Sequence, residues 1–202
     1  MSPPGGSGRL ARPAEGPLMW PWEHLAIGYI CYALWRRGAG RSRPTVEEVA
    51  VLAIGTQFPD LVDKPLGWGT TLLPSGTSLA HSLLITIPVV VGADLLARRV
   101  GRDHLGIVFG IGYLLHLPAD ACYAVLLGGT ATAEFLLWPV IPRAPEPTTA
   151  LLARTGALWA EFSVALAGPA GAGYLLVEGL LLGTAVLLWS LDGAPGIPRR
   201  VR

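Results

Sequence analysis

The longest uncharged stretch of the sequence spans 29 residues, between Lys64 and Asp94. A transmembrane helix needs about 20 consecutive apolar residues, so this stretch is long enough to cross a bilayer. Hydrophobic residues make up 51% of the chain and charged residues 14%, against about 25% charged residues in a soluble globular protein. So few charges cannot cover a water-facing surface, and the sequence therefore predicts a membrane protein. The net charge of +1 argues against a basic nucleic-acid binder, and the apolar content argues against disorder for most of the chain.

Five apolar segments predict an all-α fold, a multi-span transmembrane helical bundle of about four to five helices. They cover residues 19–35, 46–58, 78–97, 104–127 and 174–191. The second segment is short for a span, and whether it crosses completely stays open. An apolar stretch from Ala157 precedes the fifth segment and breaks at Gly168-Pro169. We expect residues 1–18, rich in proline and glycine, to be a disordered tail, residues 19–192 to be the helical membrane domain, and residues 193–202 to be a basic tail.

Arginines cluster after the first, third and fifth segments. The clusters are Arg36, Arg37, Arg41 and Arg43; Arg98, Arg99 and Arg102; and Arg199, Arg200 and Arg202. If all five segments cross, the three clusters share one side of the membrane, which the positive-inside rule makes cytoplasmic. We therefore expect a multi-pass protein of the cytoplasmic membrane.

Seven ionisable side chains lie within or beside these apolar segments, where each costs roughly 2.5–3.5 kcal/mol on insertion scales and by default indicates function. They are His24, Asp60, Asp63, His81, His116, Asp120 and Glu178. In the expected topology the first six lie at a similar depth, near the extracytoplasmic leaflet. Unrelated polar residues would have no reason to converge in this way.

The types and spacing of these six residues suit metal binding. His116 and Asp120 are four residues apart, on one face of a helix, while Asp60 and Asp63 lie three apart between two prolines. Imidazole and carboxylate ligands suit zinc, manganese or iron, with zinc favoured. Three carboxylates are balanced by one or two divalent ions, so the sequence predicts a membrane-interface metal site.

Each residue taken alone also has a simpler interpretation. His24 can be a hydrogen-bonded residue at the membrane interface, and Asp60 can cap a helix or turn. His116 and Asp120 can form an intramembrane hydrogen-bonded pair that holds helices together. Glu178 lies in the fifth segment, where support of the metal site and helix packing are equally open. The convergence of the set is what favours the metal site.

Five short strings, in their order along the chain, resemble the membrane-bound metal-dependent hydrolase family, whose bacterial members are described as inner-membrane, LexA-binding hydrolases. The strings are Glu23-His24, Pro59-Asp60-Leu61-Val62-Asp63, Ala80-His81-Ser82, His116-Leu117-Pro118-Ala119-Asp120 and Leu137-Trp138-Pro139. The resemblance covers about residues 19–140, and the first strings look most like archaeal members. Each string alone is weak, whereas the ordered set is fairly specific.

This resemblance implies a distant similarity to zinc-dependent phospholipase C and P1 nuclease, which hydrolyse phosphoesters at a multi-metal site. Carried over residue by residue, it gives the metal ligands as His24, Asp60, Asp63, His81, His116 and Asp120. Two departures stand out. Ala80 replaces a threonine of the family's third string, and Pro118 interrupts the last His-x-x-x-Asp element.

The sequence thus predicts a hydrolase in which a metal-activated water attacks a lipid ester or phosphoester. Asp63 is the expected catalytic base, and the membrane lipid is both environment and substrate, with no nucleic-acid partner. A transporter of metal ions or protons is one rival, but a relay should place polar residues through the full depth of the bundle. A non-catalytic scaffold with a structural metal is the other, and its ligands would saturate the ion.

Overall fold

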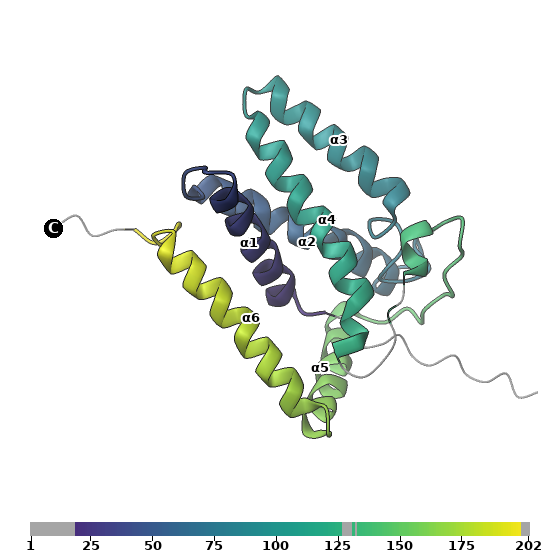
Figure 1. The fold of residues 1–202 in the computed structure, drawn as a ribbon. Coiled ribbons are helices and arrows are strands. Elements are labelled where there is room, and N and C mark those ends of the chain that lie inside the picture. The colour runs from purple at the N-terminus through teal and green to yellow at the C-terminus, as the bar shows by residue number, and fades with distance from the viewer. Residues whose placement is uncertain (1–18, 127–130, 132, 199–202) are drawn as a thin grey trace, which may run out of the picture.

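The structure of the protein is a computed structural model that describes residues 19–126, 131 and 133–198. The regular secondary structure of these residues consists of helices alone (Figure 1). They are α1 (Pro21–Gly38), α2 (Val46–Trp68), α3 (Leu83–Arg99), α4 (Asp103–Leu126), the 3-10 helix η1 (Glu134–Leu137), α5 (Leu151–Ala167) and α6 (Gly171–Leu191). The all-α helical bundle is confirmed. One α-helix more than expected is present because α5 begins well before the break at Gly168. The predicted N-terminal tail lies outside the described residues, as do residues 199–202 of the C-terminal tail.

Helix α2 is much longer than the predicted residues 46–58. A capping box fixes its start: Thr45 Oγ1 accepts from the N–H of Glu48 at 3.2 Å, and Glu48 Oε2 accepts from the N–H of Thr45 at 2.7 Å. The helix then continues through Pro59 and Pro65 to Trp68. The prediction of a short segment ending at Phe58 was therefore wrong, and Asp60 and Asp63 lie on the helix itself.

Helix α3 begins five residues later than predicted, at Leu83. The side chain of Ser82 caps it by accepting from the N–H of Leu84 at 3.2 Å. The residues just before Ser82 form a turn because their backbone N–H groups point to a carboxylate of α2 rather than along a helix. This turn belongs to the loop of residues 69–82, which carries His81.

Helices α2 and α4 are packed backbone to backbone. A Cβ atom at Gly55 would lie 2.5 Å from the carbonyl oxygen of Phe109, and a Cβ at Gly112 would lie 2.7 Å from that of Leu52. Both distances are too short for any larger residue. Small residues let membrane helices approach in this way. In Figure 1, α4 consequently lies at the centre of the molecule, between α2 and α3.

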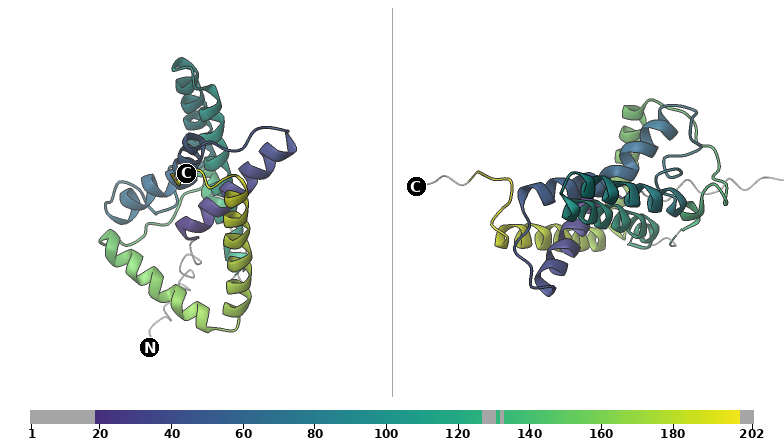
Figure 2. Two further views of the ribbon diagram at one scale, coloured as in Figure 1. Left: turned by 90° about the vertical axis from the view of Figure 1, so that its left-hand side faces the viewer. Right: turned by 90° about the horizontal axis from the view of Figure 1, so that it is seen from above.

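Among the described residues, two helices are long and apolar enough to cross a membrane. They are Asp103–Tyr123 of α4, with a mean hydropathy of 1.5, and Gly171–Leu191 of α6, with a mean hydropathy of 1.8. Figure 2 shows α6 along one side of the molecule, joined at its N-terminus to α5. Crossing by the remaining predicted spans stays a prediction.

Candidate metal centre

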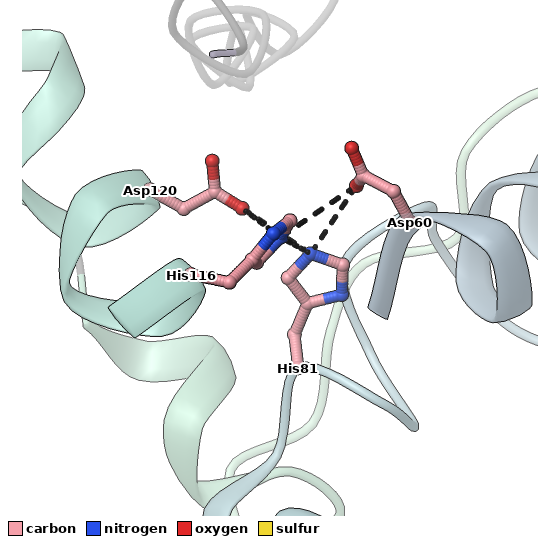
Figure 3. Close-up of side chains that lie close together, drawn as sticks. All are labelled: Asp60, His81, His116 and Asp120. Atoms are coloured by element: carbon pink, nitrogen blue, oxygen red, sulfur yellow. Dashed lines mark hydrogen bonds and ion pairs between the residues drawn. The ribbon is translucent and has the colours of Figure 1, made fainter. Parts of the chain in front are cut away.

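Four side chains from three parts of the fold converge on one point (Figure 3), three of them buried and the fourth, Asp120, partly buried. Asp60 comes from α2, His81 from the loop of residues 69–82, and His116 and Asp120 from successive turns of α4. One ligand atom from each residue lies within 4.8 Å of the others. The Nε2 atoms of His81 and His116 are 3.1 Å apart, and Asp120 Oδ2 lies 3.2 and 3.1 Å from them.

The second ring nitrogen of each histidine is held by an acceptor. His116 Nδ1 lies 2.7 Å from the backbone carbonyl oxygen of Thr56, and His81 Nδ1 lies 2.8 Å from Asp63 Oδ2. A carbonyl oxygen and a carboxylate can only accept, so each Nδ1 carries a proton, and when both rings are neutral each turns a lone pair at Nε2 toward the other. Two facing lone pairs repel, and a cation or proton between them removes the repulsion.

Asp60 completes the cluster from the other side. Its Oδ2 forms an ion pair with Lys64, one helical turn later. Its Oδ1 has no hydrogen-bond partner and lies 3.5 Å from His81 Nε2 and 3.8 Å from His116 Nε2. A buried carboxylate oxygen without a partner is costly, and a bound cation would supply the missing interaction.

The cluster has the dimensions of a metal site. Two nitrogen ligands of a tetrahedral zinc ion, each bonded at about 2.0–2.1 Å, lie roughly 3.3 Å apart. Each Nε2 atom lies 3.1–3.8 Å from the other Nε2 and from the two carboxylate oxygens, and all four atoms lie within 4.8 Å of one another. Two imidazoles with two carboxylates suit zinc, manganese or iron. The four residues could therefore hold one divalent ion.

The electrostatic environment also favours a cation. Burial alone would lower the pKa of His81, but the neighbouring carboxylates of Asp120, Asp60 and Asp63 raise it well above its ordinary value. The surrounding carboxylates thus stabilise positive charge at this position. The same field that favours a proton on the imidazole would favour a metal ion, and binding the ion releases the proton.

His24 lies beside the four residues without joining them. Its ring stacks on that of His116, with centroids 3.8 Å apart and planes 13° apart, and its Nε2 lies 3.2 Å from Asp120 Oδ1. This approach lacks hydrogen-bond geometry, so both nitrogens of the buried His24 ring are without a hydrogen-bond partner. Asp120 thus turns one oxygen to His24 and the other to the two histidines of the cluster.

Asp63, expected to be a ligand and the catalytic base, is placed behind His81 instead. Its carboxylate accepts from the backbone N–H groups of Ser78, Ala80 and His81 at 2.8–3.2 Å, as well as from His81 Nδ1. The carboxylate therefore faces the loop and orients His81. The three backbone N–H groups that hold it gave no signal in the sequence.

Two further residues lie apart from the cluster. Glu178 Oε1 accepts from Trp22 Nε1 at 2.8 Å in an exposed contact between α1 and α6. His104 is exposed at the start of α4. Sequence reasoning missed Lys64, although its spacing of four residues from Asp60 was a usable signal. It also missed the carbonyl group of Thr56, which no side-chain pattern reveals.

The proline-rich segment after η1 packs on the loop that carries His81. The N–H of Glu146 donates to the carbonyl oxygen of Pro74 at 2.7 Å, and the N–H of Thr149 donates to that of Trp68 at 2.9 Å. Glu146 Oε2 also accepts from Trp68 Nε1 at 2.9 Å. The segment thereby fixes the end of α2 and the loop that follows it.

In a comparison with known protein families, a family model matches residues 19–193. The chain belongs to the YdjM inner membrane protein family. The matched region contains every residue of the cluster, and the family supports a location in the inner membrane. No curated protein and no solved structure matches the chain.

Proposed function

We propose that this YdjM-family protein is a membrane-embedded, metal-dependent hydrolase of a lipid ester or phosphoester. The observation that carries the proposal is the convergence of His81 Nε2, His116 Nε2 and the unpartnered Asp60 Oδ1 on one buried point. A divalent ion held there, zinc in the first instance, supplies a water of lowered pKa and positive charge opposite the developing negative charge of the reaction.

The residues around the cluster fix its geometry. Asp63 orients His81, the carbonyl group of Thr56 orients His116, and Lys64 holds the outer oxygen of Asp60. Such supporting contacts set the direction in which each ligand points. Because all three ligands are held before an ion binds, the site is preorganised.

His24 is the proposed proton acceptor. Both its ring nitrogens are free of hydrogen bonds, and Asp120 Oδ1, 3.2 Å from Nε2, stabilises the imidazolium that forms. Water oxygen bonds to the phosphorus or carbonyl carbon, its proton passes to His24 Nε2, and the bond to the alcohol breaks. The departing alkoxide then takes the proton. Asp63 does not serve as the base because both its oxygens accept hydrogen bonds.

The position of the site along α4 supports the proposal of a lipid substrate. His116 and Asp120 lie in the C-terminal part of Asp103–Tyr123, a helical segment able to cross the membrane. A site near the end of such a segment lies at the depth of lipid ester and headgroup bonds. With the arginine clusters on the cytoplasmic side, this end lies near the extracytoplasmic leaflet of a multi-pass protein.

The test combines metal analysis with a hydrolysis assay on detergent-purified protein. Elemental mass spectrometry of wild type is expected to find a divalent metal, and the loaded protein is expected to release product from a phospholipid. His24→Gln should keep the metal and lose most of the hydrolysis, while His104→Ala, a matched control, should change neither. A metal-loaded wild type that cleaves no lipid ester or phosphoester would overturn the proposal.

A structural metal is the second candidate, favoured by the burial of the cluster. The side chains of Asp60 and Asp120 are 8% and 10% exposed, and four ligands saturate a tetrahedral ion. In that case His24→Gln leaves every property unchanged, and removal of the metal lowers the melting temperature. A catalytic site predicts instead that His24→Gln changes turnover without changing stability in the loaded state.

A further inference from the structure

A second polar site lies between the C-terminal ends of α1 and α6. It is a cavity of about 290 Å³, and its lining includes Arg36, Arg37, Arg41, Arg43, Leu191 and Asp192. Figure 1 shows the ends of α1 and α6 on the same side of the molecule, to which the C-terminal end of α3 also points. His116 and Asp120 lie toward the opposite end of α4, so this cavity is distinct from the candidate metal centre.

The loop that forms one wall is held rigidly by Arg36. Arg36 Nε donates to the carbonyl oxygen of Ser42 at 2.7 Å, and Arg36 Nη2 donates to Ser42 Oγ at 3.0 Å. Arg36 Nη1 donates to Tyr32 Oη at 2.9 Å and forms an ion pair with Glu48. Gly40, at φ +64°, makes the left-handed turn out of α1. Arg41 and Arg43 are therefore presented by a preformed loop.

The opposite wall is the end of α6, which Asp192 fastens to α1. Asp192 Oδ2 accepts from Tyr29 Oη at 2.7 Å, and Asp192 Oδ1 accepts from Arg37 Nη2 at 2.7 Å. One buried and one partly buried polar contact thus join the end of α6 to α1. The cavity is a fixed feature of the fold.

The charges in and around the cavity do not balance. Arg36 is paired with Glu48, and Arg37 is paired with Asp192. Neither Arg41 nor Arg43 forms an ion pair with a carboxylate of the described residues, and the Arg41 guanidinium instead lies 4.7 Å from the centre of the Trp35 ring. Two positive charges are left for an anionic ligand, and guanidinium groups bind phosphate in bidentate fashion.

Apolar surface continues from the cavity in the direction of the membrane. Leu191, on its rim, is 55% exposed, and Leu34 on α1 is 53% exposed. Further exposed leucines follow along α6 toward its N-terminus, Leu187, Leu180 and Leu176 among them. A soluble anion would use only the arginines, whereas a phospholipid would use both surfaces.

We propose that this cavity binds the phosphate headgroup of an anionic phospholipid, whose acyl chains lie against α1 and α6. Its volume is near the lower end of ligand pockets, which span roughly 300–1,000 Å³, so it accommodates a headgroup and leaves the chains outside. Basic pockets between membrane helices are suited to anionic headgroups. The two uncompensated arginines favour a lipid with two phosphates over a lipid with one.

The test is lipid binding by the full chain purified in a neutral detergent. Native mass spectrometry and thermal unfolding are followed during titration with phosphatidylglycerol, cardiolipin, phosphatidylcholine or inorganic phosphate. Wild type is expected to retain and be stabilised by the two anionic lipids, with cardiolipin the tighter. The double variant Arg41→Gln/Arg43→Gln should bind them roughly tenfold or more weakly, since each basic residue near an anionic surface contributes substantially.

The control variant is Arg98→Gln/Arg99→Gln, which removes the same charge from the end of α3, outside the cavity lining. It should bind the anionic lipids as wild type does, and neither double variant should change metal content. Equal binding of phosphatidylcholine, or equal loss in both double variants, would overturn the proposal. Stabilisation by inorganic phosphate alone, with none added by the lipids, would also overturn it in favour of a free-anion site.

Discussion

The pair of helices α2 and α4 and the helix α6 are stabilised by opposite means. The α2–α4 pair closes around Gly55 and Gly112 and buries histidines and aspartates between its helices. Helix α6 buries only Gly171 and Tyr174 and leaves most of its apolar side chains exposed. Buried polar groups require partners within the protein, whereas an exposed apolar helix requires lipid around it.

We infer from this contrast that the α2–α4 pair holds the metal cluster, whereas α6 anchors the protein in the membrane. Substitutions between α2 and α4 should alter metal binding and internal stability. Substitutions along the middle of α6 should alter neither, because few described side chains pack there. Four predictions test this division.

The largest effect is expected from loss of a ligand side chain. His81→Ala removes one imidazole from the cluster and should abolish stoichiometric metal binding, as should Asp60→Ala. Glu178→Gln, which neutralises the one charged residue of α6, should leave the metal content unchanged. Elemental mass spectrometry of the purified variants measures all three. Equal metal loss in Glu178→Gln would break the division between the two regions.

A smaller effect is expected from the carboxylate behind His81. Asp63→Asn keeps the size of the side chain but weakens the contact with His81 Nδ1, and loss of such a supporting contact typically lowers metal affinity about 10- to 100-fold. The exposed Asp103→Asn on α4 is the matched control and should have no effect. Competition with a chelator of known affinity gives the values. Complete loss of metal in Asp63→Asn would instead indicate that Asp63 is a direct ligand.

The packing contrast itself can be tested with alanine at two glycines. Gly112→Ala places a methyl group against the backbone of α2 and should destabilise the fold by about 1–3 kcal/mol, with weaker metal binding because His116 follows on the same helix. A Cβ at Gly179 on α6 meets no atom within 4 Å, so Gly179→Ala should be neutral or slightly stabilising. Thermal unfolding in detergent measures both. Similar melting temperatures would show that the close approach of α2 and α4 is dispensable.

The smallest effect is expected where α6 is attached to α1. Tyr174 Oη donates to Glu23 Oε1 at 2.5 Å within a buried cluster, so Tyr174→Phe should cost about 1–2 kcal/mol. Trp22→Phe removes the exposed bond to Glu178 and should change stability by less than about 0.5 kcal/mol. Metal content should be unchanged in both. Metal loss in Tyr174→Phe would mean that α6 also supports the cluster.

Part of this arrangement could be predicted from the sequence. The all-α fold follows from composition and from the lengths of the apolar segments. The expected topology put several ionisable residues at one depth, and the structure brings Asp60, His81, His116 and Asp120 together. Spacing of four residues placed His116 and Asp120 on one face, which α4 preserves through Pro118.

The rest depended on contacts that no residue pattern encodes. Proline normally ends a helix, yet α2 runs on through Pro59 and Pro65, beyond the apolar run that was expected to end at Phe58. Asp63 faces the loop because backbone N–H groups of the loop donate to it. Almost every residue has such a group, so the residue types do not show which of them will meet Asp63. The role of the carbonyl group of Thr56 likewise depends on how closely two glycines let α2 and α4 approach.

The hydrogen bonds of Asp63 also restrict how the loop can vary among family members. Asp63 accepts hydrogen bonds from the backbone N–H groups of Ser78, Ala80 and His81. The next residue, Ser82, is the N-cap of α3. An insertion or deletion within residues 78–82 would shift the imidazole away from its position, whereas one within residues 71–73, before the contact of Pro74 with Glu146, would change only the length of the loop. Length differences between relatives should therefore be confined to the first half of this loop.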